Sequence, residues 1–152
     1  MIPSSANRLV IGERLGFIQE YLQEIRALPL TNPAVHSHDR WNMAAAESYL
    51  RRALEALLDT GRHIGAKAYG SPATEYKQIA IKLREYKVLT QEESNFLFAM
   101  AGYRNRMVHF YHEVTSEELY TICTTQLGGI ERVADAYRRW VNANPQLVSD
   151  EL

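Results

Sequence analysis

Apolar residues spaced alternately three and four positions apart constrain the fold of this chain more than any other feature. Ile11, Leu15, Ile18, Leu22 and Ile25 follow this spacing, which places them on one face of an α-helix. The stripe predicts a helix from about residue 5 to residue 28. No segment shows the alternation of apolar and polar residues, bounded by turn residues, that is typical of a β-hairpin.

Helix-capping signals divide the remainder of the chain. Asp39 is placed to cap a second helix, which the segment YGSP at residues 69–72 ends. A shorter third helix is predicted over residues 74–86. The segments TQEE at residues 90–93 and TSEE at residues 115–118 are capping boxes, which predict the starts of a fourth and a fifth helix.

The fifth predicted helix is the one with an internal irregularity. It extends to NANP at residues 142–145, and the pair Gly128 and Gly129 marks a candidate kink. With 152 residues and no internal linker, the chain is predicted to be a single domain over residues 1–152. We therefore expect an all-α fold, an antiparallel bundle of about five helices.

Composition narrows the class of protein. No apolar run approaches the roughly 20 residues that span a bilayer, and the N-terminal residues lack the layout of a signal peptide. Cys123 is the only cysteine, which fits a reducing cytoplasm, and its helical spacing among apolar residues predicts an inert core position. The net charge of −1 gives no general signal for nucleic-acid binding, so any affinity for phosphate has to be local.

The segment YRNRMVHFYHEV, residues 103–114, concentrates chemistry in a few positions. On a helix, Arg104 shares a row with Leu97, Ala101 and Val108, where a guanidinium is costly unless an anionic group meets it. Asn105 and His109 share a second row and are close enough to interact.

These groups suffice in principle for cleavage of RNA without a metal. His109 titrates near neutral pH and can take the proton of the ribose 2′-OH, which DNA lacks. Arg104 can stabilise the charge that grows on the phosphorus, and Asn105 can orient the imidazole or bind the phosphate. A second proton source is needed for the leaving oxygen, and a symmetric dimer would supply it.

A polar helix end in water is the alternative interpretation. Arg104 and His109 lie about 140° apart on a straight helix, so their spacing alone does not bring them together. The residues of this segment leave both interpretations open.

At these positions the sequence resembles the HEPN superfamily and, within it, the HepT toxins of toxin–antitoxin pairs. The family motif R-x-x-x-x-H-x-Y stands here as RNRMVHFY, with Arg104, Asn105, His109 and Tyr111. The resemblance extends to segments of the first three predicted helices: ERLGFIQEYLQEI, AAESYLRRALEALLDTGRHI and EYKQIAIKLREYKVLTQE.

The resemblance implies a HEPN-like helical homodimer with an RNA cleft at its interface. It implies a cytoplasmic toxin of a type VII system, a metal-independent endoribonuclease that cleaves mRNA or tRNA. It also implies a cognate antitoxin, an MNT-type nucleotidyltransferase that transfers AMP to Tyr111. The alternative within the same family is a catalytically silent HEPN module that binds nucleotides or a nucleotidyltransferase.

Several other polar residues are weaker candidates. Arg106, His112 and Asp39 are possible RNA contacts, although a solvated role is favoured for Arg106. HSHD at residues 36–39 lacks a second cluster of ligands, so we predict no metal site and no cofactor. The cations of the second helix are interpreted as an exposed face paired with its acidic residues. YRRW at residues 137–140 is interpreted as core aromatics beside surface cations.

Overall fold

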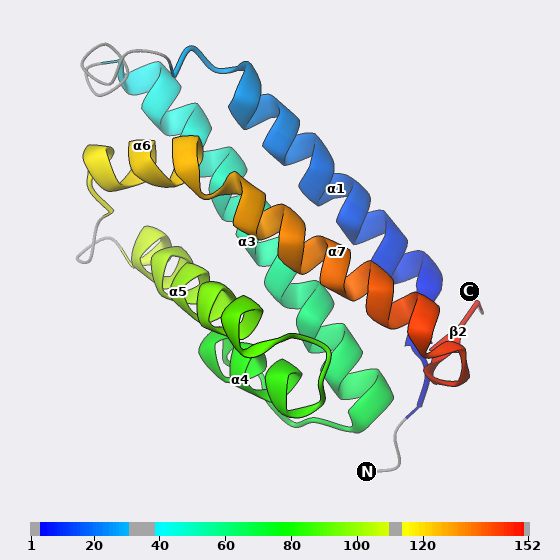
Figure 1. The fold of residues 1–152 in the computed structure, drawn as a ribbon. Coiled ribbons are helices and arrows are strands. Elements are labelled where there is room, and N and C mark those ends of the chain that lie inside the picture. The colour runs from blue at the N-terminus through cyan, green and yellow to red at the C-terminus, as the bar shows by residue number, and fades with distance from the viewer. Residues whose placement is uncertain (1–3, 31–38, 110–113, 151–152) are drawn as a thin grey trace.

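The structure is a computed structural model that describes residues 4–30, 39–109 and 114–150. Within these ranges it contains six α-helices: α1 (Arg8–Ala27), α3 (Arg40–Tyr69), α4 (Tyr76–Glu85), α5 (Gln91–Val108), α6 (Ser116–Thr125) and α7 (Leu127–Ala143). Figure 1 shows α1 and α7 lying along the long helix α3, with α4 and α5 packed together on another side of it.

The first predicted helix is confirmed as α1. All five residues of its apolar stripe are buried, and they face α3. Its N-terminus lies at Asn7, whose side chain accepts hydrogen bonds from the backbone N–H groups of Leu9 and Val10. The helix therefore starts a few residues later than predicted, where an asparagine satisfies its first free donors.

The predicted caps are also confirmed. The Asp39 carboxylate accepts from the N–H groups of Trp41 and Asn42 at 3.0 and 3.1 Å. Complete capping boxes start α5 at Thr90 and α6 at Thr115. The far end of α3 is closed by Gly70 in the left-handed conformation, φ 63°, which a glycine adopts without steric cost.

The predicted count of about five helices requires a correction. The fifth predicted helix is two helices, α6 and α7, which meet at Gln126. A Cβ added to Gly129 would lie 2.3 Å from Cε2 of Phe96 on α5. The first turn of α7 thus packs closely on the Phe96 ring, and the chain changes direction between α6 and α7, just before this contact (Figure 1).

A short pairing of two strands was not predicted. β1 (Ala6–Asn7) pairs in parallel with β2 (Val148–Ser149), which follows the 3₁₀ turn η2 (Pro145–Leu147). Two residues per strand give no detectable alternation in a sequence. The pairing joins the segments near the two ends of the chain (Figure 1).

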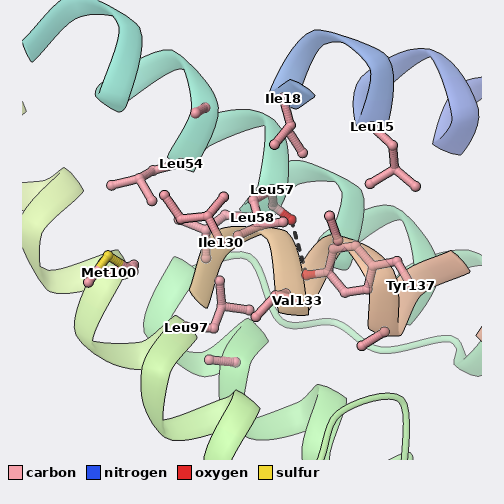
Figure 2. Packing of buried hydrophobic residues seen from close by; sticks show 14 of the residues in the cluster. Leu15, Ile18, Leu54, Leu57, Leu58, Leu97, Met100, Ile130, Val133 and Tyr137 are labelled. Atoms are coloured by element: carbon pink, nitrogen blue, oxygen red, sulfur yellow. Dashed lines mark hydrogen bonds between the residues drawn. The ribbon is translucent and has the colours of Figure 1, made fainter. Parts of the chain in front are cut away.

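The core lies where α1, α3, α5 and α7 meet (Figure 2). Tyr137 of α7 is completely buried, and its hydroxyl donates to the carbonyl of Leu57 on α3 at 3.1 Å. Cys123 is buried as predicted, and burial raises the pKa of its thiol to about 12, which makes it unreactive. None of the helices in the described ranges has the length and apolar character that crossing a membrane requires.

Candidate active site

The motif residues lie at the C-terminal end of α5. The helix ends at Val108, and His109 follows in an extended conformation, with its N–H donating to the carbonyl of Asn105 at 3.1 Å. The angles expected for a straight helix therefore hold only as far as Val108. Tyr111 and His112 lie outside the described residues.

Arg104 meets the anionic partner that its apolar row requires. Its Nη2 lies 3.7 Å from Oε2 of Glu55 on α3, and its Cζ lies 4.8 Å from the ring centroid of Tyr76 on α4. Its Nη1 donates to Oδ1 of Asn105 at 3.4 Å. The side chain is 23% exposed, so the guanidinium is held between three helices with one part open to solvent.

One donor of this guanidinium is unsatisfied. Nε of Arg104 is buried and makes no hydrogen bond with any residue that the structure describes. A buried donor without an acceptor costs about 1–3 kcal/mol, and such groups are uncommon outside functional sites. The position of Arg104 is thus one that packing alone does not favour.

The two partners of Arg104 are themselves held in place. Glu55 also accepts from Nη1 of Arg51 at 2.9 Å, through its other oxygen. The Tyr76 hydroxyl donates to Asp59 at 2.8 Å. Burial and this hydrogen bond to Asp59 raise the pKa of Tyr76 to about 12, so its ring stays neutral and is a stable support for the cation.

Two adjoining hollows border the end of α5. His109 lines one of about 310 Å³, and Arg104 lines the other, of about 330 Å³. Asn105 and Lys77 line both. Within one chain, the guanidinium and the imidazole therefore face neighbouring hollows rather than a common one, with Asn105 between them.

Arg106 is a surface cation, with its side chain 38% exposed, and it has an acidic partner that the sequence did not indicate. It forms a bidentate ion pair with Glu118 at 2.6 and 2.9 Å, and its Cζ lies 5.7 Å from the ring centroid of Tyr103. The hydrogen bonds from Arg106, and then those of Thr115, hold the pKa of Glu118 at about 2. Because Glu118 belongs to the capping box of α6, this pair connects the end of α5 to the start of the next helix.

Residues 18–137 match the family model described as "Ribonuclease HepT-like". The chain belongs to this HepT-like family. The tRNA nuclease HepT of Aphanizomenon flos-aquae (strain 2012/KM1/D3) is 23% identical over 112 residues, which cover 74% of this chain and 76% of that protein.

Solved structures share the HepT-like fold. The tri-AMPylated HEPN toxin of Shewanella oneidensis, in complex with its MNT antitoxin, aligns with a TM-score of 0.79 at 21% identity, covering 86% of this chain and 97% of that one. YutE of Bacillus subtilis, a cytosolic protein of unknown function, aligns with a TM-score of 0.79 at 22% identity, covering 95% and 96%. A toxin–antitoxin complex with AMP-PNP gives 0.78 at 20% identity, covering 86% and 98%.

Among the weaker candidates of the HepT-like chain, Asp39 lies apart from Arg104. Asp39 is occupied by its capping hydrogen bonds, and it precedes Glu55 by about 24 Å along α3 at 1.5 Å per residue. The described residues contain no cluster of metal-ligating side chains.

The predicted ion pairs of the second helix are found for two of its arginines, whereas His63 is half-buried and accepts a hydrogen bond from the N–H of Asn7. On α3, Arg51 pairs with Glu55 and Arg62 with Asp59. In YRRW the two aromatic residues are buried, and the two arginines pair with acidic residues, Asp135 and Glu93.

Sequence reasoning missed the role of Tyr76 and paired Glu55 only with cations of its own helix. Neither residue has a local signal that relates it to the motif. An arginine in an apolar row does predict that an anion meets it, although it does not tell which one.

Proposed function

We propose that this chain is the toxin of a HEPN/MNT toxin–antitoxin pair, an endoribonuclease that cleaves cellular mRNA or tRNA without a metal ion. The observation that supports it most is the placement of Arg104. Its guanidinium has an unsatisfied buried donor, and it contacts the Glu55 carboxylate and the Tyr76 ring. It also lies next to Asn105, which lines the His109 hollow. A structural ion pair has no need of this arrangement, whereas an anionic substrate would benefit from it.

In the proposed reaction the RNA supplies its own nucleophile. His109 takes the proton of a ribose 2′-OH, and the 2′ oxygen forms a bond to the adjacent phosphorus. The bond from phosphorus to the 5′ oxygen breaks, which leaves a 2′,3′-cyclic phosphate and a 5′-hydroxyl. Arg104 stabilises the additional negative charge on the non-bridging oxygens, and Asn105 orients the phosphate.

The leaving 5′ oxygen needs a proton, and the adjoining hollows of one chain offer one imidazole. We therefore propose a homodimer in which the ends of two α5 helices border one RNA cleft. His109 of the partner subunit then donates the proton. Each phosphate would meet both guanidiniums, which explains why Arg104 and His109 need not share a hollow within a chain.

The proposed control of this activity is covalent. A cognate MNT-type nucleotidyltransferase would transfer AMP from ATP to Tyr111, with the tyrosine oxygen attacking the α-phosphorus, pyrophosphate leaving and the hydroxyl proton passing to solvent. Two similar structures are described as HEPN toxin with MNT antitoxin and as a toxin–antitoxin complex with AMP-PNP. The added phosphate would bind Arg104 by charge and exclude RNA by bulk.

Mass measurement after co-expression tests this modification. Wild-type toxin isolated with its nucleotidyltransferase should carry AMP on Tyr111, and Tyr111→Phe should carry none and stay toxic. A neutralised toxin with an unmodified Tyr111 would leave complex formation, not AMP transfer, as the route of inhibition.

Cleavage of a defined RNA tests the catalytic assignment. His109→Ala and Arg104→Ala should each lower the rate by about 100-fold or more, with helical content and oligomeric state unchanged. Arg138→Ala is the matched control, because this arginine belongs to α7, lines neither hollow of the site and pairs with Asp135 of the same helix. Wild-type activity should persist in EDTA.

The same cleavage assay distinguishes the proposed ribonuclease from the alternative, a catalytically silent HEPN module. A wild-type protein that binds the nucleotidyltransferase but cleaves no RNA would be a silent HEPN module. Wild-type cleavage by His109→Ala would disprove the assignment of the base.

A further inference from the structure

Lys77 lies between the two hollows of the candidate site. It belongs to the first turn of α4, is exposed, and lines both the His109 hollow and the Arg104 hollow. Of the residues around the motif, it shares this position only with Asn105. An RNA strand that runs from the His109 hollow to the Arg104 hollow therefore passes the ammonium group of Lys77.

The charge of Lys77 is not matched by a carboxylate, in contrast to its neighbours. Arg62, Arg104 and Arg106 pair with acidic residues: Asp59, Glu55 and Glu118. In the described part of the chain, no carboxylate oxygen lies within the 4.0 Å of an ion pair from the Lys77 ammonium. A phosphate that binds Lys77 would displace only water and counterions, whereas binding to the arginines competes with their acidic partners.

The lysine side chain is also supported in place. Its Nζ lies 5.4 Å from the ring centroid of Phe98 on α5, and Phe98 is 40% exposed. A Cβ added to Gly102 would lie 3.7 Å from Cε of Lys77, so the lysine stem lies over the bare backbone of α5. The ring and the backbone thus hold the ammonium beside the His109 hollow at a reduced entropic cost.

We propose that Lys77 binds a backbone phosphate of single-stranded RNA next to the scissile phosphate, as the strand passes from the His109 hollow to the Arg104 hollow. The inference rests on the proposed function, because it assigns the substrate path of that same site. Lys77 is a substrate-binding residue in this account and takes no proton. An ammonium suits the role because it binds phosphate as a point charge without a fixed geometry.

Salt-dependent binding tests the assignment. The probe is a fluorescein-labelled single-stranded RNA, and His109→Ala is the background, so that cleavage does not disturb the equilibrium. Lys77→Met should weaken binding several-fold and lower the slope of log Kd against log salt concentration by about 0.7, the value for one phosphate contact on a single strand. The methionine keeps an apolar stem over Phe98.

Two further variants make the result specific. Lys77→Arg should have the same RNA affinity and the same salt slope as the His109→Ala protein with Lys77 intact. Lys82→Met on the same helix should change neither, because Lys82 pairs with Glu85 at 3.1 Å.

The outcomes separate the inference from the proposed function. If Lys77→Met binds RNA with an unchanged slope, the assignment of Lys77 is wrong, while cleavage that depends on His109 still stands. If His109→Ala cleaves at the wild-type rate but Lys77→Met lowers the slope, the catalytic assignment fails and the phosphate contact stands. Absence of RNA binding in the His109→Ala background would overturn both.

Discussion

Replacing Gly61 by alanine tests how tightly the helices around the site are packed. Gly61 is buried in α3, and a Cβ added there would lie 2.6 Å from the Tyr137 hydroxyl and 2.7 Å from Cδ1 of Leu83. Both neighbours are themselves buried, and the hydroxyl is bonded to the carbonyl of Leu57. The methyl group can be accommodated only if the side chains of Tyr137 and Leu83, or the helices α7 and α4 that carry them, shift away from α3.

The expected change in the free energy of unfolding has three contributions, of which two are destabilising and one is stabilising. Overpacking a core costs about 1–3 kcal/mol, and displacing the Tyr137 hydroxyl costs about 1 kcal/mol more. Alanine regains about 1 kcal/mol of helix propensity. We expect a net loss of about 2 kcal/mol in the free energy of unfolding, which lowers Tm by about 4–8 °C for a chain of this size.

Urea denaturation and thermal scans measure this change, and α1 offers a matched control. Nothing lies within 4 Å of a Cβ added to Gly12 or Gly16, so alanine at either position should stabilise the protein by up to about 1 kcal/mol. In a Tyr137→Phe background, Gly61→Ala should cost less, since the nearest atom is gone. A Gly61→Ala protein as stable as Gly16→Ala would refute the close packing of α3 against α7.

Two further predictions concern local interactions. Asp39→Ala should lower the unfolding free energy, measured in urea, by about 1 kcal/mol, because two N–H groups of α3 lose their acceptor. Asp39→Asn should lower it much less, because asparagine also caps helices. Equal decreases for the two variants would contradict the role of Asp39 as the cap. Burial, and then the charges of Arg14 and Lys67, lower the pKa of His63, whose Nε2 accepts the N–H of Asn7 at 2.9 Å. The folded-state pKa thus lies below the unfolded value near 6.5, so this stabilisation is complete above about pH 6.5 and decreases below it. When the pH is lowered from 8 to 5, the free energy of unfolding measured in urea should fall less for His63→Gln than for the wild type. Equal falls in the two proteins would contradict the assignment.

The sequence predicted those parts of the fold whose signals are local. The stripe of α1 and the caps at Asp39, Thr90 and Thr115 depend on residues within one or two turns, and all are found in the structure. The sequence marked a candidate kink at Gly128 and Gly129, but it did not predict that the segment divides into two helices at Gln126. The division accompanies the contact of Gly129 with Phe96, which belongs to another helix.

The candidate site likewise has a part that the sequence predicted and a part that it did not. Arg104, Asn105 and His109 lie within six consecutive residues at the end of α5, so their pattern was visible in the sequence. The groups that hold Arg104 come from α3 and α4, and no periodicity relates Glu55 or Tyr76 to the motif. Sequence reasoning could state that Arg104 needs an anionic partner, because burying a cation is costly. The partner's identity required the packing of three helices.

The central claim is that the RNA's own 2′-OH carries out the cleavage, with His109 as the base. Its most direct test compares an RNA with the same RNA bearing one 2′-deoxyribose immediately 5′ of the mapped cut. The account predicts a 2′,3′-cyclic phosphate from the unmodified RNA and no cleavage at the deoxy position. Cleavage of the deoxy-substituted bond at the normal rate would contradict it.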